Sequence, residues 1–175
     1  MGANDLSLLI LQLAVGLTFA AHGAQKVFGW WGGPGLTAWE GAMAHMGFRP
    51  ARLFGTVSAL VELVGGLLLA VGFLTPLVAA VLVAQTVVII GKVHLQHGFF
   101  NSKSGIEFPL VLGVGAAAVG LAGPGAIGLD AVLGLSVDPT VRALLLVVGI
   151  VVGLATLAVP GLETRLASRT HAAAR

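Results

Sequence analysis

The chain has 175 residues, of which 57% are hydrophobic and only 9% are charged, and its formal net charge is +2 at pH 7. So few polar residues cannot cover a water-soluble globule, which excludes a soluble domain and predicts an integral membrane protein in a lipid bilayer. The nine basic residues are scattered between apolar segments and form no phosphate-binding patch, so no nucleic-acid partner is expected.

Five apolar segments meet or approach the length of about 20 residues that a membrane-spanning helix needs. They are Leu6–Phe28, Leu53–Phe73, Leu77–Val93, Phe108–Gly123 and Val141–Val159. The sequence therefore predicts an all-α membrane bundle, in which the short third and fourth spans are tilted or extended by polar residues at their ends. The first segment follows Asp5 and no Lys or Arg, which favours a retained span over a cleaved signal peptide.

The loop after the first span, "GLTAWEGAMAHMGFRP", predicts a short interfacial helix over residues 37–46. Thr37 precedes Glu40 by three residues, which is the spacing of a capping box, and Gly47 is a stop signal. The apolar residues Leu36, Trp39, Met43 and Met46 share one stripe of this helix. A loop anchored by tryptophans and a lid over the bundle are the two open readings of this segment.

The basic residues fall mainly on one side of the membrane when the five spans alternate in direction. Those on the side of the first loop, the third loop and the C-terminus are Lys26, Arg49, Arg52, Lys92, Lys103, Arg165, Arg169 and Arg175. Arg142 alone falls on the other side. The positive-inside rule therefore predicts an external N-terminus and a cytoplasmic C-terminus, joined by an odd number of spans.

Glu62 lies near the middle of the second span. At 1.5 Å per residue from Leu53 it is about 13 Å deep, where an ionised carboxylate costs at least a few kcal/mol. The small residues on its face of the helix are Gly55, Ser58, Gly65 and Gly66. This face is expected to pack inside the bundle, where Glu62 needs a partner or a proton. A protonated Glu62 that only joins two helices is the structural alternative.

Other polar residues lie near the predicted cytoplasmic ends of the spans. They are His22 and Lys26 on the first span, Gln85 and His94 on or after the third, and Glu107 at the start of the fourth. With Glu62, they predict a polar funnel open toward the cytoplasm, with Glu62 and Gln85 at its floor and the others round its mouth. Such a mixture of imidazole, ammonium and carboxylate groups suits proton transfer to and from a bound ligand. Snorkelling of Lys26 and simple packing of His22 are the alternatives.

Two histidine pairs raise the question of a metal or a haem. His94 and His97 are three residues apart and have the spacing to share a metal ion, whereas His22 and His94 together have the donors to clamp a haem. Neither spacing is specific, so no metal site is assigned from the sequence.

Four stretches stand in a characteristic order along the chain: "HGAQKVFGWWGG", "VELVGGLLLAVGFLT", "HLQHGFFNSKSGIEFPL" and "LAGPGAIGLD". In this order they resemble the successive motifs of the DoxX family of small bacterial membrane proteins. The resemblance implies a DoxX-like four-helix membrane domain over residues 1–135, and it leaves residues 136–175 as an additional membrane helix with a basic cytoplasmic tail. The recurrent polar positions of the family fall here on His22, Lys26, Glu62, His94 and Glu107.

The resemblance also implies a redox role in the bacterial inner membrane, because DoxX-like and DoxD-like proteins are associated with quinone-linked oxidation. On this reading the chain is a quinone-interacting subunit of an oxidoreductase system, with a quinone as its cofactor. Its expected quinone-binding residues are His22, Lys26, Glu62, Gln85, His94 and Glu107, of which Glu62, His22 and Lys26 are expected to be catalytic. A membrane or soluble redox partner protein is expected to supply the electrons.

Two other functions are compatible with the sequence. One is a non-catalytic anchor or assembly subunit in a homo- or hetero-oligomer, whose Gly149-x-x-x-Gly153 motif binds other membrane helices. The other is a small transporter or proton pathway, which needs an exit past Gln12 toward the external side. Replacement of Glu62 or His22 in a pure anchor is expected to lower the yield of the complex without changing its turnover.

Overall fold

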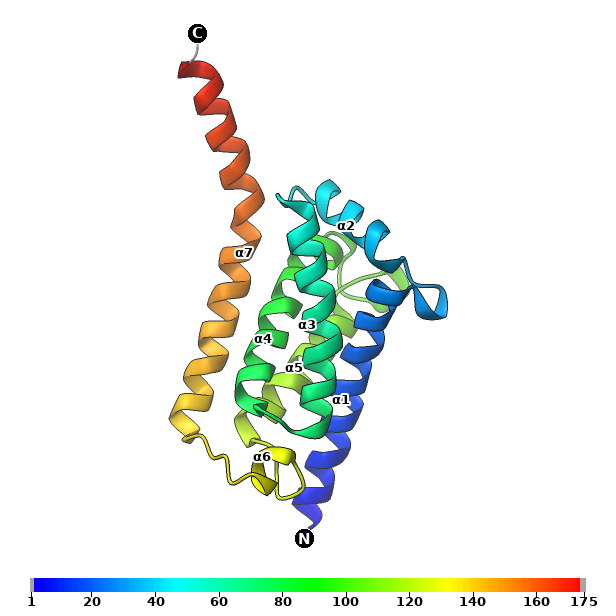
Figure 1. Ribbon diagram of the computed structural model, residues 1–175, viewed down its shortest axis with the longest axis vertical. Helices are drawn as coiled ribbons and strands as arrows, with labels where there is room; N and C mark the ends of the chain where they lie inside the picture. The colour runs from blue at the N-terminus through cyan, green and yellow to red at the C-terminus, as the bar shows by residue number, and fades with distance from the viewer. Residues whose placement is uncertain (1, 174–175) are drawn as a thin grey trace.

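Five long apolar helices run lengthwise beside one another in the computed structural model (Figure 1). They are α1 (Ala3–Phe28), α3 (Ala51–Val71), α4 (Thr75–Ile89), α5 (Glu107–Ala122) and α7 (Pro139–Ala173). The structure describes the backbone of residues 2–173 and the side chains of residues 2–160. Arg175 and the side chains of Arg165 and Arg169, in the expected basic tail, therefore lie outside the described part.

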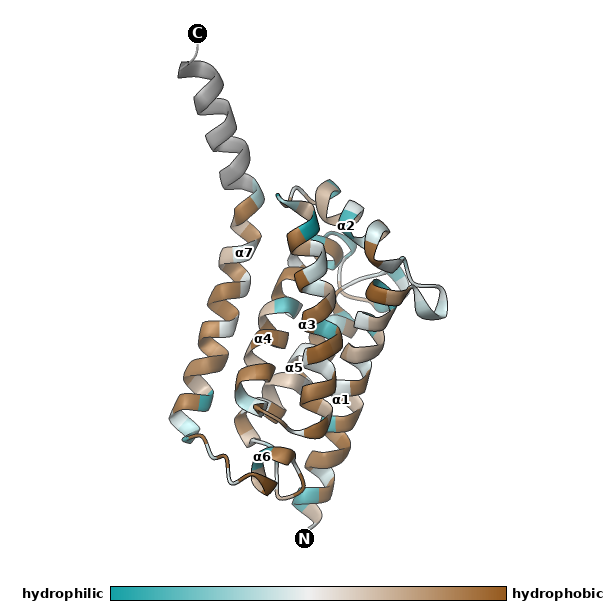
Figure 2. Cartoon of the chain, viewed as in Figure 1, coloured by the Kyte–Doolittle hydropathy of each residue, from teal (hydrophilic) through white to brown (hydrophobic). Residues whose placement is uncertain are grey.

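The predicted membrane fold is confirmed, with one difference at the fourth span. Among the described residues, α1, α3, α4 with its continuation to His97, and residues 139–160 of α7 are long and apolar enough to cross a membrane. Helix α5 is shorter, with 16 residues. Figure 2 shows that the long helices are hydrophobic along most of their lengths. The chain is therefore a multi-pass membrane protein, and its termini lie at opposite ends of the bundle (Figure 1).

Short helices cover the two ends of the bundle. At the end away from the N-terminus lie η1 (Trp30–Gly32) and α2 (Gly35–His45), together with three turns between α4 and α5. These turns are the π-helix η2 (Ile90–His94) and the 3-10 helices η3 (Leu95–His97) and η4 (Asn101–Lys103). At the N-terminal end lies α6 (Leu129–Val132). We refer below to the "α2 end" and the "N-terminal end" of the bundle.

The helix in the first loop is confirmed, but its predicted start is wrong. It begins at Gly35 with Pro34 as its N-cap, and no side chain makes a capping hydrogen bond. Thr37 is thus inside the helix, and the expected capping box does not form. Glu40 is instead held by a neighbouring helix, because its Oε1 accepts a hydrogen bond of 3.0 Å from Thr56 Oγ1 of α3. This tertiary contact outweighs the local capping signal.

Small residues bring α1 and α3 into close backbone contact. A Cβ atom on Gly16 would lie 2.5 Å from the backbone nitrogen of Ala70 and 2.7 Å from the carbonyl oxygen of Gly66. The face of α3 that was predicted to pack inside the bundle does so, since Gly55, Ser58, Glu62 and Gly66 are all buried. Close approach of this kind is how membrane helices pack without a hydrophobic driving force between them.

The two glycines of the Gly149-x-x-x-Gly153 motif also serve packing within the chain. A Cβ on Gly149 would collide with the carbonyl oxygen of Ala80, and one on Gly153 would lie 2.7 Å from the carbonyl oxygen of Ala84. Both contacts are with α4. The motif therefore joins α7 to α4 in this structure, and it does not face another protein as the anchor hypothesis expected.

The apolar core fills the N-terminal half of the bundle. Its buried members include Val15, Phe19, Leu69, Leu82, Ala116 and Val119. Gln12 lies in the same half with no exposed surface, and its amide nitrogen donates to the carbonyl oxygen of Ala70 at 3.2 Å. The described polar groups of the candidate site are therefore gathered in the other half, toward the α2 end.

Candidate functional site

The Glu62 carboxylate lies where α1, α3 and α4 meet, and its side chain is 1% exposed. Its Oε1 accepts hydrogen bonds from Lys26 Nζ at 2.5 Å and from Gln85 Nε2 at 3.2 Å. Its Oε2 is buried, and no described side chain or backbone group donates to it. Buried carboxylate oxygens are normally hydrogen-bonded, so this open acceptor indicates a place for a further donor.

Lys26 is the ionic partner of Glu62, and this partner lies deeper than the sequence suggested. We expected Lys26 at the mouth of a funnel, but from the last turn of α1 its flexible side chain reaches back to Glu62 and is only 13% exposed. Its ammonium also lies 4.1 Å from the centre of the Trp39 ring. A cation close to an indole face is stabilised by the ring quadrupole, so Lys26 is held between a carboxylate and an aromatic ring.

Trp39 belongs to the site although the sequence analysis did not assign it there. Helix α2 lies across the end of α3, and the Trp39 indole N–H donates to Ser58 Oγ at 2.8 Å. Ser58 in turn donates to the carbonyl oxygen of Gly55 at 3.3 Å. The sequence placed Trp39 on the apolar stripe of an interfacial helix and did not predict that it faces into the bundle. Its position over Lys26 depends on how α2 folds back over α3, which hydropathy alone does not specify.

A cavity of about 330 Å³ opens beside Glu62. This volume is near the lower end of the range of about 300–1,000 Å³ that is typical of small-molecule sites. The polar residues that line the cavity are His22, Lys26, Trp39, Glu62, Thr86, His94 and Asn101. The remaining wall is apolar and includes Phe19, Phe108 and Leu112. Such a cavity suits a mainly apolar ligand with a few polar atoms.

The two cavity histidines face it from different elements. His22 of α1 is half-buried, and its ring centre lies 5.5 Å from that of Phe108 on α5. His94 ends the π-helix, and its Nδ1 lies 2.7 Å from the carbonyl oxygen of Ser104. Because a carbonyl oxygen only accepts, Nδ1 carries the proton in this bond. The Nε2 atom of a neutral His94 is therefore an acceptor.

Two of the predicted site residues do not line this cavity. Glu107 lies at the start of α5, where its Oε2 accepts the backbone N–H of Asn101 at 2.9 Å. It thus orders the loop that carries Asn101, which does line the cavity. Gln85 touches the site through its bond to Glu62, but its side chain lines a neighbouring cavity. The structure therefore brings His22, Lys26, Glu62 and His94 to one cavity, with Gln85 behind Glu62.

His94 and His97 are each oriented by the backbone carbonyl of another residue. His97 Nδ1 bonds to the carbonyl oxygen of Val93 at 2.9 Å, and His94 bonds to that of Ser104. Within the part of the chain that the structure describes, no three His, Asp or Glu side chains lie close enough to hold a metal ion together.

Chemically, the site offers one fixed cation, one buried carboxylate with an open oxygen and one imidazole acceptor round an apolar space. Lys26 has N–H groups beyond the one directed to Glu62 and can donate to a ligand oxygen. Glu62 Oε2 and His94 Nε2 can accept from a ligand hydroxyl. The site can therefore bind two oxygen atoms of one small ligand and exchange protons with them.

Comparison with known proteins identifies the family. The family model for DoxX matches residues 7–95, which include Lys26, Trp39, Glu62, Gln85 and His94. No curated protein and no solved structure matches the sequence. The matched segment is more than half of the chain and carries the central residues of the cavity. The chain belongs to the DoxX family.

Proposed function

We propose that this DoxX protein is a quinone-interacting subunit of a membrane oxidoreductase system, and that the cavity beside Glu62 takes the quinone ring. The observation that carries the proposal is the open Oε2 of the buried Glu62 carboxylate, next to an apolar cavity of about 330 Å³. Family membership supports it, since the DoxX resemblance implies quinone-linked chemistry.

The residues of the cavity fit a quinone ring. Such a ring has two apolar faces and two carbonyl oxygens on opposite edges. Phe19, Phe108 and Leu112 provide apolar surface for the faces. Lys26 and a ring N–H of His22 can donate to these oxygens. When bound, a quinone supplies the carrier for two electrons, and its oxygens take up protons on reduction.

The chain's own residues would hold and move those protons. The Lys26 ammonium donates to a ligand oxygen and pairs with the Glu62 carboxylate in a region where an unpaired charge is costly. Glu62 Oε2 accepts the hydrogen of a ligand hydroxyl and can take its proton, while Gln85 fixes the carboxylate through Oε1. His94 Nε2 then provides a proton acceptor nearer to the α2 end. A membrane or soluble partner protein would exchange the electrons.

We also propose that the α2 end faces the cytoplasm of a bacterial cell. Among the residues with described side chains, the basic residues of this end are Lys26, Arg49, Arg52, Lys92 and Lys103. The N-terminal end has Arg142. This asymmetry supports a cytoplasmic α2 end under the positive-inside rule, so protons would enter the site from the cytoplasm.

Tryptophan fluorescence tests quinone binding directly, because quinones quench indole emission and Trp39 lines the cavity. The purified protein is titrated with a short-chain quinone. Wild type should show saturable quenching, and Trp39→Phe should lose the saturable part while Trp30 and Trp31 still emit. Lys26→Gln should weaken the apparent affinity by about tenfold, the value of one charged hydrogen bond. Quenching that rises linearly and equally in wild type and Trp39→Phe would refute the proposal.

A further inference from the structure

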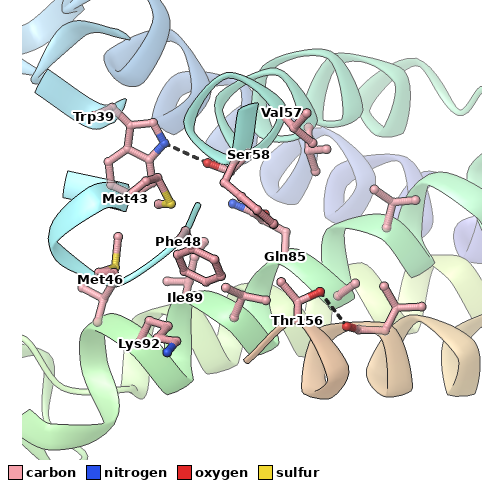
Figure 3. A pocket seen from close by; sticks show the side chains of 17 residues that line it. Trp39, Met43, Met46, Phe48, Val57, Ser58, Gln85, Ile89, Lys92 and Thr156 are labelled. Atoms are coloured by element: carbon pink, nitrogen blue, oxygen red, sulfur yellow. Dashed lines mark hydrogen bonds between the residues drawn. The ribbon is translucent and has the colours of Figure 1, made fainter. Parts of the chain in front are cut away.

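A second cavity, of about 220 Å³, lies between α3, α4 and α7 beneath α2 (Figure 3). Its walls are mainly apolar, and the valines among them include Val57 of α3, Val81 of α4 and Val152 of α7. These three side chains are 49%, 41% and 51% exposed. The cavity is therefore a groove that opens sideways, onto the surface that the hydrocarbon of the membrane covers. We call it the α3–α7 groove.

The groove exists because α7 packs on α4 along one stripe only. Gly149 and Gly153 lie against the α4 backbone, and Leu157 packs over Gly91 one turn further along. Val152 and Thr156 lie on the next stripe of α7 and line the groove. The Thr156 hydroxyl donates its hydrogen to the carbonyl oxygen of Val152 at 2.8 Å, so it needs no hydrogen-bond acceptor from a ligand. The groove wall is thus suited to an apolar chain.

The length of the groove matches one leaflet of a bilayer. Between Val81 of α4 and Lys92 of η2 the chain rises about 16 Å, which is roughly half of a hydrocarbon core about 30 Å thick. At the α2 end the groove is covered, because Gly47 of the turn after α2 meets Pro160 of α7, where an added Cβ would lie 3.0 Å from the proline Cβ. An occupant would therefore enter from the side and lie along the groove.

Lys92 lines the groove at its α2 end, and Arg49 follows Phe48, another lining residue, in the chain. The Lys92 ammonium lies 5.4 Å from the centre of the Phe48 ring, and Arg49 Nη1 donates to the carbonyl oxygens of Ala44 and Phe48. No carboxylate with a described side chain lies within 4.0 Å of the Lys92 or Arg49 cation. An apolar groove of one-leaflet length with the Lys92 cation at one end is complementary to a lipid with a negative headgroup.

We propose that the α3–α7 groove binds an anionic phospholipid, with one acyl chain along the valines and the phosphate at Lys92. The lipid would also touch the candidate quinone site indirectly. Gln85 lines the groove and donates to Glu62, so the acyl chain lies against the residue that fixes the Glu62 carboxylate. The proposal does not depend on quinone binding, since the groove and the Glu62 cavity have different ligands.

Native mass spectrometry of the full chain tests this inference. The delipidated protein is titrated with phosphatidylglycerol and, separately, with phosphatidylcholine. Wild type should retain one phosphatidylglycerol in preference to phosphatidylcholine. Lys92→Gln should weaken phosphatidylglycerol binding by about tenfold, since it removes one charged contact with the phosphate. Lys103→Gln is the matched control, because Lys103 is an exposed lysine that does not line the groove, and it should bind like wild type.

A second variant keeps the test decisive if Lys92→Gln fails to fold. Val152→Trp fills the groove from α7 and should reduce the binding of both lipids. Equal binding by wild type, Lys92→Gln and Lys103→Gln would overturn the proposal, as would full lipid retention by Val152→Trp. Inorganic phosphate at the same concentrations should not displace the lipid. Displacement by phosphate would show that the site binds only an anion and does not bind the acyl chain, which would overturn the proposal.

Discussion

At the scale of single residues, the account depends on the buried Lys26–Glu62 pair. Both charges are removed from water, which costs free energy that their attraction and the Gln85 hydrogen bond must offset. Loss of only one partner leaves the other charge buried and unpaired, which is worse than loss of both. The pair is therefore expected to show strong coupling in mutagenesis.

We expect Lys26→Met to lower the free energy of unfolding by about 3 kcal/mol, because the Glu62 charge then lacks a counter-ion. Adding Glu62→Gln should restore most of this loss, since the amide carries no charge and still accepts the Gln85 hydrogen bond. Thermal unfolding in detergent, followed for wild type, both single variants and the double variant, measures the coupling. Additive effects of the two substitutions would show that the groups do not interact.

Trp39 supplies the second residue-scale prediction. Trp39→Phe keeps an aromatic face over Lys26 but loses the hydrogen bond to Ser58, which should cost about 1 kcal/mol of stability. Trp39→Ala also removes the ring that covers the ammonium and lines the cavity, and should cost about 3 kcal/mol. Chemical unfolding of the two variants side by side measures the difference. Equal losses would mean that the ring over Lys26 contributes nothing.

The sequence identified Glu62 because burying a carboxylate in the middle of a long apolar segment costs free energy in every side-chain conformation. It did not identify the partner, because depth along a helix places a Cα atom and not the end of a long side chain. Lys26 was thus expected at the mouth of the funnel, whereas its ammonium contacts Glu62 at the floor. Glu107 shows the reverse case. It lies at the expected end of the bundle, but its carboxylate is engaged by the Asn101 N–H.

At the scale of elements, hydropathy predicted which segments are helices but not how they end. The third span was expected to end at Val93, and the regular part of α4 ends at Ile89 and continues as the π-helix η2. A π-turn rotates the following residues relative to an α-helix, and such turns are frequent at functional sites. Here η2 carries Val93 and His94, both of which line the Glu62 cavity. No periodicity in the sequence marks that change.

The contact of α7 with α4 gives the element-scale prediction. Gly153→Leu should destabilise the protein, because its Cβ would lie 2.7 Å from Ala84 oxygen and Val87 Cβ and would push the two helices apart. Gly41→Ala is the matched control, since no heavy atom lies within 4 Å of its Cβ position in helix α2. It should be neutral or stabilising by up to about 1 kcal/mol. Melting temperatures in detergent compare the two.

If Gly153→Leu melts like wild type, α7 does not depend on this close contact, and the glycines are free to serve another membrane helix. That outcome would restore the anchor reading of the motif. A melting temperature below that of wild type, together with an unchanged or raised one for Gly41→Ala, supports packing within the chain.

At the scale of the whole molecule, two features predict the membrane topology. The basic residues are concentrated at the α2 end of the bundle, and the two termini lie at opposite ends of it (Figure 1). A reporter that is active only in the cytoplasm should be active when fused after Arg175. The same reporter inserted between Leu133 and Asp138, in the connection at the N-terminal end, should be inactive. Fusions in bacterial cells measure both. The reverse pattern would place the Glu62 cavity on the external side and contradict the cytoplasmic proton route.

The sequence predicted the membrane bundle well because its signal, apolar length, is the same property that the bilayer selects. It predicted the cavity less completely. The residues that line the Glu62 cavity come from α1 to α5. The α3–α7 groove depends on which stripe of α7 packs against α4. Such contacts between elements distant in sequence are absent from hydropathy and local spacing. Only the three-dimensional structure shows that Trp39, Asn101 and Phe108 line the cavity.

The central claim is that Glu62 takes up a proton from a quinol in the cavity when an electron acceptor oxidises that quinol. Infrared difference spectroscopy measures this directly, because a carboxyl group has a carbonyl stretch only when protonated. Oxidation of a short-chain quinol by an added electron acceptor, which takes the two electrons, should produce a carboxyl band in wild type that is absent in Glu62→Gln, whereas both proteins remain folded. No carboxyl band in wild type, or the same band in Glu62→Gln, would contradict the account.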